Sequence, residues 1–303
     1  MAGSGTGYIL RALAANGAIA ISKGFGAWFT GSAAMLAETL HSLSDCINQL
    51  LLLLGLRRAR KPPSDKYPLG RGRELYFWSF MVAMLLFLGG GAYSIYEGIH
   101  KVKHPSHVEN PWLAIGILGF GLVLELWSMS GALKAINERR EGRTIVRYLR
   151  ETKDSDLVVI TGEDFAACLG LALALIAVAL SMITGDPMWD ALGTLAIGVV
   201  LVGIAVFLAV EVKSLLVGEA ADPAMTKQIQ DIADDDPCIE KVLRCLTLQQ
   251  GPGEIMVAMK LKMKDDLTGK EMVDAINKFE VRLQERMPEI KWSFVEPDHT
   301  DAD

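Results

Sequence analysis

MLAETLHSLSDCINQLLLLL, residues Met35–Leu54, is the stretch that decides the fold. It is apolar enough to cross a bilayer, yet it carries the ionisable side chains Glu38, His41 and Asp45. Such groups are costly at membrane depth unless they are paired, hydrated or bound to metal. His41 and Asp45 are four residues apart, which places an imidazole and a carboxylate on one helix face. The pattern predicts a membrane helix that supplies two ligands for a divalent cation.

The composition is that of a membrane protein. Of the 303 residues, 51% are hydrophobic, and the mean hydropathy is +0.29. A soluble protein needs more polar surface than this leaves. Windows of about 20 residues give six spanning candidates: Tyr8–Phe29, Gly31–Leu56, Leu75–Ile99, Trp112–Ala135, Leu157–Thr184 and Ala191–Leu215. We expect an α-helical transmembrane domain over residues 1–217 and a soluble domain over residues 218–303.

Basic side chains in the short loops predict the orientation. Seven Lys and Arg residues lie between the second and third spans, and five Arg residues lie between the fourth and fifth. Both loops are therefore expected in the cytoplasm, and an even number of spans places both termini there. The N-terminal segment shows neither a signal-peptide pattern nor an Arg- and Ser-rich transit composition. This favours an uncleaved protein of a bacterial inner membrane.

The tail begins with a capped helix followed by a hairpin. Asp222 and Pro223 can cap and start a helix, and residues 238–248 are typical of a strand. A second strand, after a Gly- and Pro-rich turn, alternates apolar and basic residues. Its apolar positions are Ile255, Val257, Met259, Leu261 and Met263. The alternation predicts a half-buried strand.

A second helix and a third strand complete the tail. Thr268 and Glu271 form a capping box at the start of the helix. The helix carries an apolar stripe of Met272, Ile276, Phe279, Leu283 and Met287. Residues 290–295 then read as a strand, which gives the order α-β-β-α-β and resembles a small ferredoxin-like domain. Its core is modest, so pairing with a second copy would help to stabilise it.

Acidic residues in other spans are the candidate partners of the first two ligands. One helix offers too few ligands for a tetrahedral site, and the fifth span carries Glu163 and Asp164. Adjacent residues diverge by about 100° around a helix, so we favour Asp164 as the ligand and Glu163 as an auxiliary ligand or proton carrier. Glu38 and Glu125 either relay protons or hydrogen-bond to a neighbouring helix, and the sequence favours neither reading.

Three histidines follow the third span: His100, His104 and His107. They could collect a departing metal ion. Pro105 interrupts the helical register there, so we interpret them as loop residues.

These features together resemble the cation diffusion facilitator family of divalent-metal transporters. The resemblance covers essentially the whole chain and rests on TGSAAMLAETLHSLSD, the loop ending YPLGRGRE, the stretch YSIYEGIHKVKHP, the six spans and the tail. The zinc transporter 9 type branch, with E-D-x-A-A in its fifth span, matches at Glu163, Asp164, Ala166 and Ala167. Ile160 stands where typical members have His or Asp. The family's transport site thus carries over to His41, Asp45 and Asp164, with Glu163 as a replacement fourth ligand.

The resemblance implies a homodimeric antiporter that exports a divalent cation, most often zinc, in exchange for protons. One imidazole with two or three carboxylates is a harder donor set than a His-rich zinc site, so manganese, iron and cobalt stay open. No nucleotide-binding or catalytic motif accompanies the site, so we expect neither an enzyme nor a cofactor beyond the transported metal. Arg73 with Glu219 is a candidate salt bridge at the junction with the tail.

A second reading stays open. Loss of one standard ligand could convert a transporter into a non-transporting membrane metal sensor or interaction scaffold with a degenerate site. The net charge of −6 gives no indication of a nucleic-acid partner. The expected partners are the bilayer, a divalent cation, protons and a second copy of the chain.

Overall fold

The computed structural model describes residues 4–30, 33–105, 111–140 and 142–300. Some side chains of the first two helices, including those of Glu38 and His41, lie outside the described set. The chain divides into two compact units. The first consists of Met1–Arg57, Leu75–Arg150 and Asp154–Lys213, and the second of Arg58–Glu74, Glu151–Lys153 and Ser214–Asp303.

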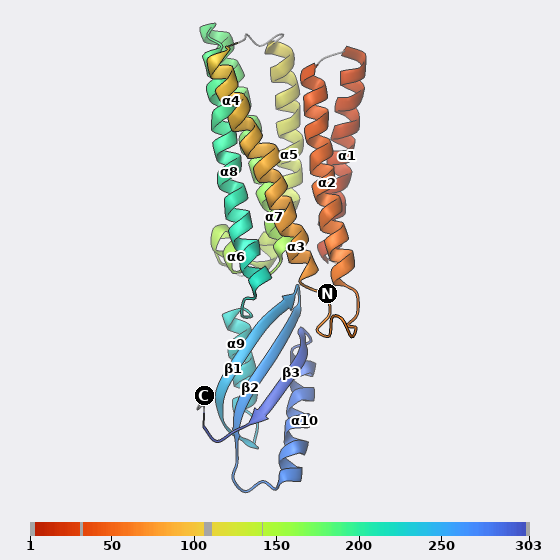
Figure 1. Ribbon diagram of the computed structural model, residues 1–303, viewed down its shortest axis with the longest axis vertical. Helices are drawn as coiled ribbons and strands as arrows, with labels where there is room; N and C mark the ends of the chain where they lie inside the picture. The colour runs from red at the N-terminus through yellow and green to blue at the C-terminus, as the bar shows by residue number, and fades with distance from the viewer. Residues whose placement is uncertain (1–3, 31–32, 106–110, 141, 301–303) are drawn as a thin grey trace. The chain divides into compact units, whose positions relative to one another are not determined.

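Long helices build the first unit (Figure 1). They are α1 (Ser4–Thr30), α2 (Ala33–Ala59), α3 (Glu74–Leu85), the π-helical segment η1 (Leu86–Ala92), α4 (Tyr93–Lys103), α5 (Pro111–Arg139), the short α6 (Ile145–Glu151), α7 (Ser155–Thr184) and α8 (Met188–Val217). Because α3, η1 and α4 are continuous, they form one span.

Four helical stretches in the described part of the chain are long and apolar enough to cross a membrane: Glu74–Lys103, Pro111–Arg139, Ser155–Thr184 and Met188–Val217. They correspond to the third to sixth predicted spans, which are confirmed to this extent. Helices α1 and α2 each have 27 residues, and at about 1.5 Å per residue this is length enough to cross the hydrocarbon core. That they do so stays a prediction.

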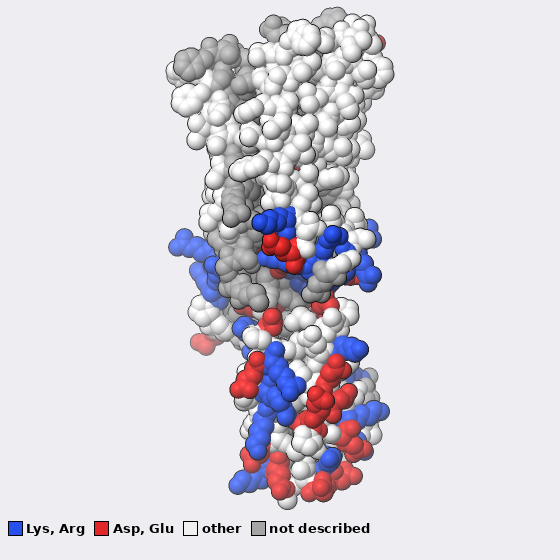
Figure 2. All heavy atoms as spheres, turned by 180° about the vertical axis from the view of Figure 1, so that it is seen from behind, with Lys and Arg blue, Asp and Glu red and all other residues white. Residues whose placement is uncertain are grey.

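Large apolar side chains cover the outside of the helical unit. Trp28 is 85% exposed, Trp112 is 74% exposed and Ile183 is 76% exposed. On the face shown in Figure 2, the charged side chains of this unit gather toward one end of its helices. Such an apolar surface is unfavourable in water and matches lipid hydrocarbon. The helical unit is therefore a membrane domain.

Glycines allow the span α3–η1–α4 to approach α8 closely. A methyl group added at Gly98 would lie 2.8 Å from the backbone nitrogen of Leu195, and one added at Gly198 would lie 2.7 Å from that of Ile95. A Cβ atom does not fit at these distances. In a membrane, where apolar helices gain little by leaving lipid, close contact at small residues is what holds helices together.

Replacement of Gly198 tests this packing. Gly198→Leu is expected to destabilise the full chain by about 1–3 kcal/mol or more, because overpacking forces the two helices apart. Thermal unfolding in detergent should show a lower midpoint than for the wild type. Gly203→Leu is the matched control on α8, because no described atom lies within 4 Å of a Cβ built there. Equal midpoints for the two variants would contradict the close approach.

The second unit contains a small mixed sheet and two helices over its described residues. Its elements are α9 (Pro223–Asp234), β1 (Ile239–Gly251), β2 (Glu254–Met263), α10 (Gly269–Arg286) and β3 (Ile290–Pro297). The strand order is β1-β2-β3, with β1 and β2 antiparallel and β2 and β3 parallel. The predicted α-β-β-α-β order is confirmed.

Local signals in the tail act as the sequence predicts. The Asp222 side chain accepts a hydrogen bond from the Ala224 amide at 2.8 Å and caps α9. Thr268 and Glu271 form the capping box of α10. The alternating apolar residues of β2 are all buried: Ile255, Val257, Met259, Leu261 and Met263. They pack with Phe279 of α10 in one core.

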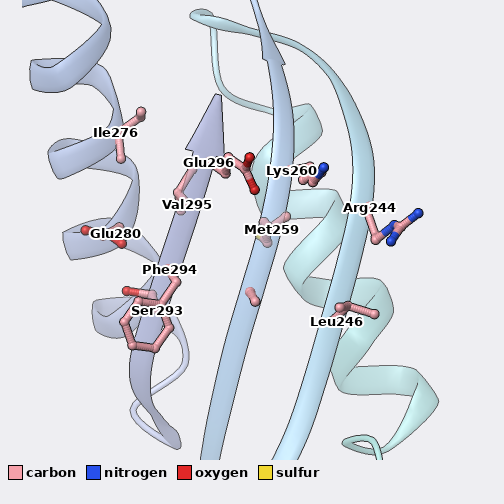
Figure 3. A pocket seen from close by; sticks show the side chains of 11 residues that line it. Arg244, Leu246, Met259, Lys260, Ile276, Glu280, Ser293, Phe294, Val295 and Glu296 are labelled. Atoms are coloured by element: carbon pink, nitrogen blue, oxygen red, sulfur yellow. The ribbon is translucent and has the colours of Figure 1, made fainter. Parts of the chain in front are cut away.

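The opposite face of the sheet carries an open pocket of about 470 Å³ (Figure 3). Its basic side chains, Arg244 and Lys260, come from β1 and β2, and its acidic side chains, Glu280 and Glu296, come from α10 and β3. Apolar side chains that include Leu246 and Phe294 lie between them. Leu246 is 59% exposed and Phe294 is 56% exposed, so this face offers apolar area together with both charges.

The loop Arg58–Glu74 belongs to the second unit and contacts its β1–β2 hairpin. A methyl group at Gly72 would lie 2.5 Å from the carbonyl oxygen of Gln250. Only glycine therefore fits at this contact. The loop that joins two membrane helices is thus packed onto the tail fold.

The predicted salt bridge of Arg73 with Glu219 stays a prediction. Glu219 makes an ion pair with Lys153, and the Arg73 guanidinium lies beside Gly218, where an added methyl group would be 3.2 Å from Nη2. Burial raises the pKa of Glu219, but hydrogen bonds from Lys153 and Ser214 and the Lys153 charge outweigh it, so that the pKa is lowered overall. Lys153 lies in the short link between α6 and α7. It is far from Glu219 in the sequence, so the sequence alone does not predict this ion pair.

Candidate metal and proton site

Helix α7 positions two of the predicted ligands. It follows Asp154, which pairs with Arg139 at 2.8 Å, and it ends at Gly185, whose φ of 71° lies in the left-handed region. The Gly185 amide donates to the Ser181 carbonyl at 2.9 Å, which is the usual helix stop. Between these ends, Glu163 and Asp164 point about 100° apart around the helix.

Glu163 faces α2. The Asn48 side-chain amide donates to Glu163 Oε1 at 2.7 Å, and Asn48 is buried. Asn48 lies on α2 and Glu163 on α7, so this hydrogen bond joins two helices. The bond fixes the Glu163 carboxylate against the helix that carries Asp45.

Asp164 faces α5. It is 4% exposed, and the Ser128 hydroxyl lies 3.4 Å from its Oδ2 atom and 3.5 Å from its Oδ1 atom. Ser128 was not among the predicted site residues. Its only signal in the sequence is its position three residues after Glu125, which places both side chains on one face of α5. The contact joins α5 to the site.

Four carboxylates from three helices form one electrostatic cluster. Glu163 interacts with Asp45, Asp164 and Glu125, and Asp164 interacts with Glu125 and Asp45. Like charges repel strongly where the surroundings are apolar. The cluster is therefore compatible with burial only when a cation or protons compensate its charge. Glu125 thus interacts electrostatically with two of the predicted ligands.

The imidazole of the predicted site lies outside the described side chains. His41 and Glu38 belong to helix α2, one and two turns before Asp45. Among the described side chains, no three of His, Cys, Asp or Glu are arranged to hold a metal ion. The ligand set of His41, Asp45, Asp164 and Glu163 stays a prediction for this reason.

Two buried oxygens extend the polar surface beyond the carboxylates. Gln49 Oε1 and Thr161 Oγ1 are buried and have no hydrogen-bond partner among the described residues. Gln49 lies one turn after Asp45 on α2, and Thr161 lies one turn before Asp164 on α7. An unsatisfied buried oxygen is costly. Water or a passing hard cation would satisfy both atoms.

Comparisons with known proteins identify the domain that contains the carboxylate cluster. A family model of the cation efflux transmembrane domain matches residues 9–217. The human protein named proton-coupled zinc antiporter SLC30A9, mitochondrial, is 31% identical over 265 residues. Metal tolerance protein C4 of Arabidopsis thaliana is 29% identical over 258 residues. The cation-efflux pump FieF of Salmonella newport is 24% identical over 280 residues.

These matches cover most of the present chain and different shares of the relatives. The human match covers 86% of this chain and 46% of the relative, and the plant match covers 84% and 56%. The Salmonella match covers 92% and 88%. The chain therefore spans about half the length of the first two relatives. The predicted likeness to the zinc transporter 9 type proteins is confirmed.

Proposed function

The chain belongs to the cation efflux family, the cation diffusion facilitators, and from that premise we propose that it exchanges a divalent metal cation for protons across a membrane. The observation that carries the proposal is the cluster of Asp45, Glu125, Glu163 and Asp164. It joins α2, α5 and α7 inside a domain whose outer surface is apolar. Such a cluster needs a cation or protons to compensate its negative charge.

The exchange follows from competition for the same atoms. Metal ions bind ionised carboxylates and neutral imidazole, so metal binding releases protons and proton binding releases metal. His41, Asp45 and Asp164 are the proposed ligands, with Glu163 as the fourth. Glu38 and Glu125 are the proposed proton carriers. Access from the two sides of the membrane would alternate as the helices rock around the site.

Zinc is the proposed substrate. The human relative is named a zinc antiporter, and one imidazole with carboxylates suits zinc while leaving manganese, iron and cobalt as competitors. The buried oxygens of Gln49 and Thr161 add hard donors beside the site. These donors lower the discrimination against manganese that a His-rich site would give.

We propose that the ion is exported from the cytoplasm, on the basis of the same loop charges that predict the orientation of the chain in the membrane. The basic loops between the second and third spans and between the fourth and fifth spans support cytoplasmic termini.

A homodimer is proposed as well, because the outer sheet face with Leu246, Phe294 and both charges could pair with a second copy of itself. A small tail gains stability from such pairing.

Reconstitution of the purified chain in sealed liposomes tests the proposal. Internal zinc or manganese and internal pH are followed with separate dyes after metal is added outside. Metal uptake is expected to be accompanied by proton movement in the opposite direction, with zinc preferred. Metal uptake without proton movement would contradict antiport. Metal binding without any uptake would favour the alternative, a metal sensor or scaffold with a degenerate site.

A further inference from the structure

Two imidazole rings meet at the end of the third span, at the end of α4, a helix that carries none of the four clustered carboxylates. His100 lies in the last turn of α4 and His104 is its C-cap residue. The His104 amide donates to the His100 carbonyl at 2.9 Å. The ring centroids are 5.1 Å apart and the rings are inclined by 49°.

The expectation that these histidines are loop residues is wrong for His100 and incomplete for His104. Pro105 restricts the residue before it, and His104 has φ −131° and ψ 71°, outside the helical region. The His104 amide nevertheless donates the last helical hydrogen bond. Pro105 therefore follows the helical turn that brings the two rings together and does not interrupt it. His107 lies outside the described residues.

The separation of the rings fits a shared metal ion. A bond of about 2.1 Å from a ring nitrogen to the ion puts each ring centroid about 3.2 Å from it. Two rings placed so at roughly the tetrahedral angle have centroids about 5 Å apart, and the observed value is 5.1 Å. The spacing of i and i+4 is also the one with which helical zinc motifs present two histidines.

The charges around the two rings permit a cation. Lys101, which directly follows His100, is paired with Asp190 of α8 at 2.9 Å, so its charge is compensated. Lys103 is exposed, where water and salt screen it. The rings lie at the C-terminal end of α4, the end at which the helix dipole favours positive charge. Both histidines are exposed, so water can complete the coordination.

We propose that His100 and His104 bind one divalent transition-metal ion through two ring nitrogens, with water as the other ligands. Two imidazoles select ions in the order of Cu²⁺ and Ni²⁺ over Zn²⁺ and Co²⁺, and they discriminate against Mg²⁺ and Ca²⁺, which prefer oxygen. The site is separate from the carboxylate cluster in α2, α5 and α7. It does not depend on the proposed transport.

Cu²⁺ titration of the full chain in detergent tests the proposal, with paramagnetic resonance as the readout. The wild type is expected to show hyperfine coupling to two imidazole nitrogens at this site. His100→Ala and His104→Ala should each leave a one-nitrogen pattern and weaken binding roughly 10-fold or more, because the second ligand of a tethered pair acts at high effective concentration. His299→Ala, which removes an exposed histidine of the tail, is the control and should change neither readout.

Two outcomes would overturn the site. One is that His100→Ala and His104→Ala keep the wild-type pattern and affinity while their thermal midpoints are unchanged. The other is that the wild type shows only one-nitrogen binding. His41→Ala separates this site from the proposed transport site, because it should alter metal uptake in liposomes and leave the two-nitrogen pattern intact.

Discussion

Asp45→Ala and Asp164→Ala are each expected to lower metal-driven proton flux in sealed liposomes by roughly 100-fold or more, since partners that only orient a ligand already cost about 10–100-fold when removed. Each substitution removes a carboxylate that both the cation and the protons use. Asp164 is buried and its carboxylate lies against Ser128 of α5. Initial rates of zinc uptake and internal pH change are measured together.

Graded variants distinguish loss of a ligand from loss of packing. Asn48→Ala and Ser128→Ala remove side chains that touch Glu163 and Asp164 without contributing a carboxylate. They are expected to reduce flux by about 10-fold. Glu138→Ala, at an exposed acid of α5, should be neutral. Wild-type flux in folded Asp164→Ala protein would refute its role as a ligand.

Phe279→Ala is expected to destabilise the tail by about 3–5 kcal/mol, the cost of removing a large buried aromatic side chain. Phe279 is 1% exposed and packs against the buried residues of β2. A folded unit of this size has a stability of roughly 4–13 kcal/mol, so the loss brings the tail close to unfolding. Hydrogen exchange of the full chain in detergent should show faster exchange in peptides from β1, β2 and α10.

Val281→Ala is the matched control for Phe279→Ala. Val281 lies on the same helix and is 57% exposed, so its truncation should change exchange little. Slow exchange in both variants would show that the α10 stripe does not hold the sheet. Peptides from α7 and α8 should keep wild-type exchange in both variants, because the tail core is formed within the second unit.

Patterns that repeat along one element were enough to predict most of the fold. Alternation in β2 and the apolar stripe of α10 specify which faces are buried, since a strand and a helix have different periods. The capping box of Thr268 and Glu271 marks where α10 begins, because both side chains act on the backbone of their own turn. Uninterrupted apolar runs likewise predict the four spans found in the described chain.

Contacts between different elements could not be predicted from the sequence. Ser128 reaches Asp164 only because α5 packs beside α7. Lys153 pairs with Glu219 because the short link between α6 and α7 brings it there. The His100 and His104 rings came together because α4 runs to Lys103 and the His104 amide still donates to the His100 carbonyl. In each case the contact depends on how separate elements pack or on where a helix ends. A pattern along a single element encodes neither.

The sequence by itself determined that this protein has a membrane domain and an α+β tail. It also determined that Asp45, Glu163 and Asp164 are candidate site residues. Apolar periodicity, capping residues and ionisable groups in apolar runs are local properties, and their energetic consequences follow from burial alone. Only the tertiary structure decided which side chains meet. It turned Glu163 toward Asn48 and Asp164 toward Ser128, because the packing of α2 and α5 around α7 sets where each carboxylate finds its partner.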